Sequence, residues 1–145
     1  MVALGCDHGG YDLKEVIRLH LEERSIPYRD FGSPAGVSCD YPDMALAPCQ
    51  AVLGGECDCA LLFCGTGIGI SIAANKIPGI RAACCSDTFS ARLTRLHNNA
   101  NALCMGGRVV GPGLAVDMVD LFLSTGFEGG RHERRVAKLQ ALEQR

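Results

Sequence analysis

The sequence lacks the features that would place the protein in a membrane, in a secretory pathway or on nucleic acid. No apolar run approaches the ~20 residues that cross a bilayer, and no basic segment followed by an apolar one opens the chain, so we expect no signal peptide. The formal net charge of −2 gives no reason to expect nucleic acid or an anionic membrane as a partner. Repeats and linkers are also missing, and 48% of the residues are hydrophobic. We therefore expect one cytoplasmic domain, residues 1–145.

Metal-binding cysteine motifs are missing too, although the chain has nine cysteines. No C-x-x-C pair occurs, and the closest spacings are Cys57 with Cys59 and Cys84 with Cys85. A zinc site is therefore not expected. An odd number of cysteines, most of them inside apolar runs, does not fit a disulfide scaffold. We expect eight of them to be small buried hydrophobes in a reducing compartment.

Apolar strand-like segments alternate with helical ones along the chain. The expected strands are Val2–Cys6, Tyr28–Phe31, Cys59–Phe63, Ile80–Cys85 and Asn101–Met105. The expected helices are Tyr11–Arg24, Pro42–Leu53, one beginning at Ile70, Ser86–His97, Pro112–Ser124 and a charged one from about Arg131. In the helix Pro112–Ser124, the residues expected to face the core are Leu114, Met118, Leu121 and Phe122. This alternation predicts an α/β fold with a five-stranded parallel sheet flanked by helices.

Polar residues follow the expected strands at the places where a parallel sheet binds its ligands. They are Asp7-His8, Cys64-Gly65-Thr66, Ser86-Asp87 and Gly106-Gly107-Arg108. Because the carboxyl ends of parallel strands share one edge, we expect these loops to meet there and form the site.

The most informative of these loops is FCGTGIGISIAANK, from Phe63 to Lys76. A strand, three glycines (Gly65, Gly67 and Gly69) and a helix can direct several backbone N–H groups at one anion. Cys64 lies at the edge of this loop, where the positive end of the helix dipole favours a thiolate. The segment therefore offers an anion hole together with a base or nucleophile. Considered alone, Cys64 could also be one more buried thiol at a strand end.

Other glycine-loop functions fit less well. A dinucleotide site needs G-x-G-x-x-G, but the third glycine is absent after Gly67, although Asp87 stands about where a ribose-binding acid would. The Gly-Lys-Ser/Thr of a P-loop is also absent. A cysteine phosphatase would need arginine where Ile70 stands.

Further candidate site residues have plausible structural alternatives. His97 precedes a polar run and could act as an acid or base, or cap a helix. His8 could bind a ligand or belong to a turn beside two glycines. Arg131 and Arg135 share a helix face that would suit a phosphate, or they could form a solvated face paired with Glu128 and Glu133.

Taken together, the motifs resemble the type B ribose-5-phosphate isomerase family, which includes galactose-6-phosphate and allose-6-phosphate isomerases. The resemblance covers nearly the whole chain. It rests on GCDHGG from Gly5, DYP from Asp40, CGTGIGISIAANK from Cys64, RLHNNAN from Arg95, GGRVVG from Gly106 and EGGRHERRV from Glu128. It implies a Rossmann-like domain with an extra C-terminal helix, and an aldose–ketose isomerase of a phosphorylated sugar that needs no metal or other cofactor. A homodimer or a pair of dimers is also implied.

The resemblance also implies roles for individual residues. Cys64 corresponds to the base that moves a proton between C1 and C2, and His97 to the acid that opens the sugar ring. The loop beside Cys64, namely Gly65, Thr66, Gly67, Ile68 and Gly69, corresponds to the segment that faces the enediolate oxygens, with Thr66 among the catalytic positions. The positions that match ligand-binding ones are Asp7, His8, Asn98, Arg108, Arg131 and Arg135.

The chain departs from parts of the family pattern and leaves some questions open. One branch of the family has a glutamate base where Ile70 stands here, so this chain resembles the cysteine branch. Asn99 replaces the aspartate more usual after the His-Asn pair. The sequence does not separate a five-carbon from a six-carbon substrate. A non-catalytic sugar-phosphate-binding subunit also remains an alternative.

Overall fold

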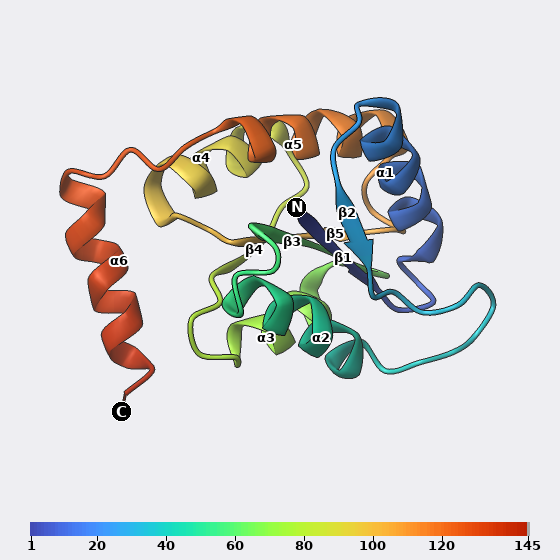
Figure 1. The fold of residues 1–145 in the computed structure, drawn as a ribbon, viewed down its shortest axis with the longest axis horizontal. Coiled ribbons are helices and arrows are strands. Elements are labelled where there is room, and N and C mark those ends of the chain that lie inside the picture. The colour runs from blue at the N-terminus through green and yellow to red at the C-terminus, as the bar shows by residue number, and fades with distance from the viewer. Residues whose placement is uncertain (145) are drawn as a thin grey trace.

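A computed structural model describes residues 1–144 and contains one all-parallel sheet of five strands (Figure 1). The strands are β1 (Val2–Cys6), β2 (Tyr28–Asp30), β3 (Cys59–Cys64), β4 (Ala82–Cys84) and β5 (Ala102–Gly106). Their order across the sheet is β2-β1-β3-β5-β4, with every neighbouring pair parallel. The predicted α/β fold and five-stranded parallel sheet are therefore confirmed.

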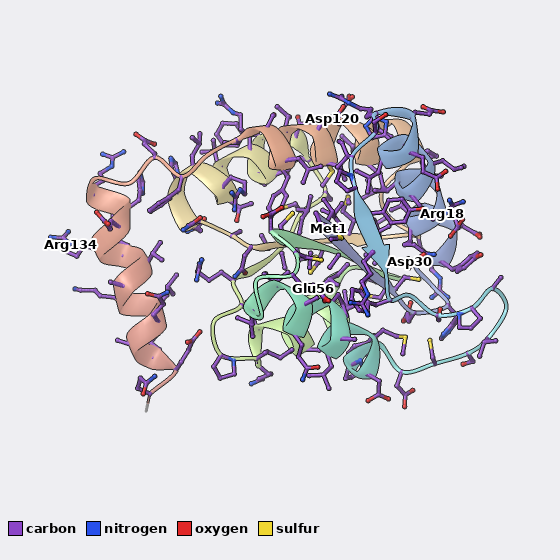
Figure 2. All side chains as sticks on the ribbon, viewed as in Figure 1. Met1, Arg18, Asp30, Glu56, Asp120 and Arg134 are labelled. Atoms are coloured by element: carbon purple, nitrogen blue, oxygen red, sulfur yellow. The ribbon has the colours of Figure 1, made fainter. Side chains whose placement is uncertain are left out.

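Helices cover both faces of the sheet, and the sheet separates the core into two layers (Figure 1). On one face lie α1 (Tyr11–Glu23), α4 (Thr88–Asn98) and α5 (Pro112–Ser124), packed on the larger cluster of buried side chains. On the other lie α2 (Tyr41–Leu53) and α3 (Ile68–Asn75). Helix α6 (Arg131–Leu142) stands apart beyond α4, and Figure 2 shows Arg134 pointing away from the rest of the chain. The predicted extra C-terminal helix is thus present.

Strand alternation explains the two core layers. In β3, Leu61 and Phe63 belong to the layer under α1, α4 and α5, whereas Leu62 and Cys64 belong to the layer under α2 and α3. Successive side chains of a strand point to opposite faces, so a strand covered on both sides must be apolar throughout. No helix among residues 1–144 is long and apolar enough to span a membrane.

Three sequence predictions need correction. Helix α3 begins at Ile68, so Gly69 lies in the helix and not in the loop before it. Leu114 is 39% exposed, because Ala115, one position further along the first turn of α5, packs on the sheet instead. Cys84 is exposed at the end of the edge strand β4 and Cys39 is half-buried, so only six of the eight cysteines expected in the core are buried.

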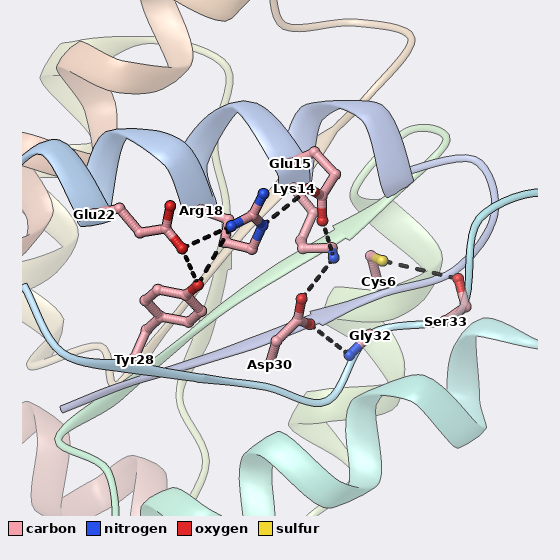
Figure 3. A network of polar contacts seen from close by, with 9 residues as sticks. All are labelled: Cys6, Lys14, Glu15, Arg18, Glu22, Tyr28, Asp30, Gly32 and Ser33. Atoms are coloured by element: carbon pink, nitrogen blue, oxygen red, sulfur yellow. Dashed lines mark hydrogen bonds and ion pairs between the residues drawn. The ribbon is translucent and has the colours of Figure 1, made fainter.

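A buried lysine joins α1 to the edge strand β2 (Figure 3). The Lys14 ammonium donates to Glu15 and Asp30, both at 2.6 Å, and the side chain is only 3% exposed. Burial would lower the pKa of Lys14, but the hydrogen bonds to Asp30 and Glu15 outweigh it and raise the pKa above its usual value. Asp30 also accepts from the Gly32 N–H, so it holds the chain after β2.

Replacing Asp30 by alanine should destabilise the fold more than removing an exposed partner, because it leaves the Lys14 ammonium with Glu15 alone. We expect Asp30→Ala to lower the free energy of unfolding by about 2 kcal/mol. The matched control is Glu56→Ala, which breaks an exposed pair with Arg29 and should cost under ~1 kcal/mol. Urea unfolding at one protein concentration measures both, and equal losses would contradict the importance of the partner of the buried Lys14.

Candidate active site

Three of the four loops that were predicted to meet, those after β1, β3 and β5, do so at the carboxyl edge of the sheet. Glycines make this approach possible. A Cβ atom on Gly9 would lie 3.0 Å from the Gly65 backbone nitrogen, and one on Gly107 would lie 2.5 Å from the Gly9 carbonyl oxygen. The Gly107 N–H donates to the Cys64 carbonyl at 2.8 Å, and the Arg108 N–H donates to the Gly65 carbonyl at 3.0 Å. Larger side chains would force these loops apart.

The loop after β3 turns into helix α3 through a left-handed glycine. Gly67 has φ +78°, and a Cβ atom there would lie 2.8 Å from the Met105 carbonyl carbon, so both conformation and space require glycine. Ile68 begins the helix, and its N–H donates to Thr66 Oγ1 at 3.3 Å. Within residues 1–144, nothing accepts from the N–H groups of Thr66, Gly69 and Ile70. Free N–H groups at a helix start can bind an anion.

Cys64 differs from the core cysteines in its surroundings. The Gly67 N–H donates to its sulfur at 3.2 Å, and such a donor stabilises negative charge on sulfur. Burial instead raises the pKa of Cys49, Cys59 and Cys85 to about 11, so those thiols are neutral at neutral pH. The Cys64 sulfur thus accepts a backbone hydrogen bond, whereas the sulfurs of Cys49, Cys59 and Cys85 have no hydrogen-bond partner among residues 1–144.

Polar side chains from the neighbouring loops lie at the same edge of the sheet. The guanidinium of Arg108 lies over Gly65, with Nη1 3.1 Å from the point that a Cβ atom of Gly65 would occupy. His8 is exposed, and its Nδ1 accepts from the Cys39 N–H at 3.3 Å. Asp7 is buried, and its Oδ1 accepts from the Gly9 and Gly10 N–H groups at 2.9 and 3.1 Å, so it also stabilises the turn.

Tyr41 lies against the first turn of α3, and the sequence analysis did not single it out. Its ring atoms lie 2.8–3.0 Å from the point that a Cβ atom of Gly69 would occupy, so Gly69 is needed here for close packing. The DYP motif is the signal that could have identified Tyr41, since it places an aromatic residue at the start of α2. Asp87 caps α4 by accepting from the Ser90 N–H at 2.6 Å, which gives it a structural role in place of a ribose contact.

The other predicted site residues lie elsewhere in the chain. His97 and Asn98 end helix α4, and Arg131 begins α6 with Arg135 one turn later. The C-cap of α4 is Asn99, in the left-handed conformation (φ 46°) that asparagine tolerates. His97 is therefore not the cap, and it remains 35% exposed. Arg131 and Arg135 form no ion pair with any carboxylate among residues 1–144, so the alternative of a charge-paired face fails for them.

The common direction of the strands keeps the Cys64 loop apart from His97 and its neighbours within one chain. Helix α4 returns from the carboxyl edge to the amino edge, where the Ala60 N–H donates to the Asn101 carbonyl. Cys64 lies opposite Gly106, at the far end of β5. The strand from Ala102 to Gly106 alone spans ~13 Å at 3.3 Å per residue, so His97 and Cys64 lie at opposite edges.

His97 has close partners that the sequence analysis missed. Its ring stacks on that of His132, with centroids 4.2 Å apart and planes 11° apart. Glu128 Oε2 lies 3.9 Å from His97 Nε2 and 3.8 Å from His132 Nε2. The ligand atoms of these three residues lie within 4.8 Å of one another, a grouping that the spacing of cysteines and histidines along the sequence did not indicate.

Comparison with known proteins agrees with this architecture. Residues 2–139 match the family model described as Ribose/Galactose Isomerase. Ribose-5-phosphate isomerase B of Escherichia coli K12 is 51% identical over 144 residues, covering 99% of this chain and 97% of that protein.

Solved structures give the same result. A ribose-5-phosphate isomerase B from Clostridium thermocellum has 51% identity and a TM-score of 0.97, with coverage of 99% of this chain and 97% of that one. One from Thermotoga maritima has 48% identity and a TM-score of 0.95, with 97% of each chain covered. With a family model matched along nearly its whole length and relatives of this identity, the chain belongs to the ribose/galactose isomerase family.

Proposed function

We propose that the protein interconverts ribose 5-phosphate and ribulose 5-phosphate through an enediolate. The observation that supports this most directly is the sulfur of Cys64 beside a helix start whose N–H groups are free. An enediolate needs a base next to oxyanion donors, and these groups meet that need without a metal. Relatives named ribose-5-phosphate isomerase B favour a five-carbon substrate over a six-carbon one.

His97 serves the first step, because ribose 5-phosphate is mostly a closed ring. Opening it requires removal of the proton from the C1 hydroxyl and delivery of a proton to the ring oxygen. We assign proton delivery to His97, whose imidazole is partly exposed and can reach a ligand, and the proton of the C1 hydroxyl passes to solvent water. The product is the open-chain aldehyde.

Cys64 serves the second step. Its thiolate takes the proton from C2, the electron pair moves to the C1–C2 bond, and the former carbonyl oxygen becomes the oxyanion of the enediolate. The N–H groups of Gly69 and Ile70 stabilise that oxyanion. The Thr66 hydroxyl helps the proton move from O2 to O1, and return of the proton from sulfur to C1 gives the ketose.

The phosphate fixes the substrate at a distance from the reacting carbons. Arg131 and Arg135 are exposed, lie four residues apart on α6 and are free of carboxylate partners among residues 1–144. Two such guanidinium groups bind phosphate well. Arg108 and His8 add positive charge or hydrogen bonds beside the Cys64 loop. Asp7 and Asn98 contact sugar hydroxyls. Binding energy from the phosphate can then be used at C1 and C2.

We further propose that each site is completed by a second copy of the chain. Cys64 and His97 lie at opposite edges of one sheet, so a substrate of this size cannot touch both in the same chain. Apolar side chains near the Cys64 loop, namely Ile68, Ile72, Phe89 and Val109, are all more than half exposed. Exposed apolar groups of this kind suit a protein interface. A homodimer, alone or paired, would cover them.

The nine free cysteines support a reducing compartment, and we propose the cytoplasm. The alternative of a non-catalytic sugar-phosphate-binding subunit is less well supported, because binding requires neither a sulfur beside backbone donors nor a stacked histidine.

Replacing Cys64 by alanine should remove the proton-transfer base. We expect Cys64→Ala to lower turnover of ribose 5-phosphate by at least the ~10²–10⁴-fold that general acid–base catalysis contributes. Cys84→Ala is the matched control, since this exposed thiol lies 3.9 Å from the Thr66 carbonyl but outside the proposed chemistry. An isomerisation assay measures the turnover of both variants, and circular dichroism checks that both are folded. Near-normal turnover in Cys64→Ala would contradict the assignment of Cys64 as the base.

Replacing His97 by asparagine should impair ring opening and spare enolisation. Ribulose 5-phosphate cannot form a furanose ring because its C5 hydroxyl carries the phosphate, so exchange of its C1 proton in deuterium oxide bypasses ring opening. We expect His97→Asn to lose most turnover of ribose 5-phosphate and to retain most of this exchange, as followed by proton NMR. Equal losses in both reactions would show that His97 serves another step.

Mixing two inactive variants should restore activity if the site is shared between chains. In a heterodimer of Cys64→Ala and His97→Asn, one site carries both substitutions and the other carries neither. After subunit exchange, we expect such heterodimers to reach about half of the wild-type activity per dimer. Exchange is checked by mass spectrometry of differently tagged chains. If exchange occurs and activity stays absent, the two residues act within one chain.

A further inference from the structure

His132 is the most buried histidine outside the proposed chemistry, and it lies directly against His97. It is only 4% exposed, whereas His97 is 35% exposed. The two residues belong to different helices, α6 and α4, and their rings lie nearly parallel at 4.2 Å. A contact between two helices is thus made through the flat faces of two imidazoles.

A backbone hydrogen bond joins the turn before His132 to α4, and a second one closes that turn. The Glu128 N–H donates to the Leu96 carbonyl at 3.1 Å, and the His132 N–H donates to the Gly129 carbonyl at 3.1 Å. Gly129 and Gly130 both have positive φ, which turns the chain sharply into α6. The ring of His132 is therefore held by a turn that is tied to the last residues of α4.

The charges around His132 favour its neutral form. Burial lowers the pKa of His132, and the positive charges of His97, Arg131 and Arg135 lower it further, against an opposing effect of Glu128. A neutral ring can stack on an imidazolium without repulsion, and an aromatic face attracts a cation. The stack therefore places no second positive charge against the face of His97.

A bound metal ion explains the cluster less well. The Arg131 Nε–H points at His132 Nε2 from 3.5 Å, so a cation already faces that lone pair. The lone pairs of two stacked rings also lie in two nearly parallel planes, whereas the ligands of a tetrahedral ion should converge on one point. The arrangement fits two stacked rings with the Glu128 carboxylate near the Nε2 atoms of both.

We propose that His132 is a positioning residue for ring opening, whose face holds the imidazole of His97 in the orientation that delivers a proton to the ring oxygen. Arg131 precedes His132 in α6 and is one of the proposed phosphate ligands, so the same turn carries the phosphate contact and the support of the acid. This inference rests on the ring-opening role proposed for His97.

The test compares His132→Ala with His132→Phe, which keeps an aromatic face without ring nitrogens. Misplacing a catalytic group can cost ~10²-fold. We expect His132→Ala to lower kcat for ribose 5-phosphate by roughly tenfold or more and to leave C1 exchange of ribulose 5-phosphate within about twofold. His132→Phe should recover most of the loss. His20→Ala, a change in a histidine of α1 that contacts Asp120, is the matched control.

Two further measurements separate this inference from the role of His97 itself. Adding His132→Ala to His97→Asn should lower turnover no further, since a residue that acts through His97 has nothing left to position. In NMR spectra, the ring signals of His97 should shift in His132→Ala and stay in place in His20→Ala, whatever the reaction step served by His97.

Several results would overturn the inference. Unchanged turnover in His132→Ala would do so, as would equal losses in ring opening and exchange, an additional loss in the double variant, or a failure of His132→Phe to recover activity. If His97→Asn itself shows no selective loss on ribose 5-phosphate, the proposed ring-opening role fails first, and the inference about His132 falls with it.

Discussion

The polarity of the parallel sheet is the constraint on which the site depends. Each strand ends at one edge, and each helix returns the chain to the other, so a residue that ends a strand and one that ends a helix lie far apart. Cys64 ends β3 and His97 lies at the end of α4. A substrate that requires both must lie between two chains. Under this proposal, association belongs to the chemistry itself, beyond any contribution to stability.

Close backbone packing at the carboxyl edge determines which of the nine cysteines could act as a base. Gly9, Gly65 and Gly107 bring three loops into contact, and Gly67 in its left-handed conformation aims an N–H at the Cys64 sulfur. The other strand cysteines, such as Cys59 and Cys104, have apolar neighbours that raise their pKa. Under the proposed function, the Gly67 N–H is what distinguishes Cys64 from these thiols.

The fold was largely predictable because its signals are local. Apolar runs and helical spacing gave the five strands and the helices, and the rule for parallel sheets gave the edge where the loops meet. The predictions were wrong where tertiary contacts determine which residues are buried and where a helix begins. Gly69 belongs to a helix packed under Tyr41, and Leu114 is exposed because Ala115 contacts the core. No local pattern encodes either contact.

The site was predictable in part for the same reason. Cys64 and its glycines are contiguous in the sequence, so their proximity follows from the chain itself. His132 and His97 are 35 positions apart and meet only because the turn at Gly129 and Gly130 brings α6 back onto α4. The EGGRHERRV motif contains His132, but its sequence gives no sign that the ring stacks on His97.

The most direct test of a site shared between two chains is a crystal structure with a phosphorylated hydroxamate that mimics the enediolate. We expect the hydroxamate oxygens to lie at the N–H groups of Gly69 and Ile70, with the Cys64 sulfur next to the mimic of C1 and C2. We also expect His97 of the second chain to contact the same ligand molecule. A ligand enclosed by one chain alone, or a hydroxamate away from the Cys64 loop, would contradict it.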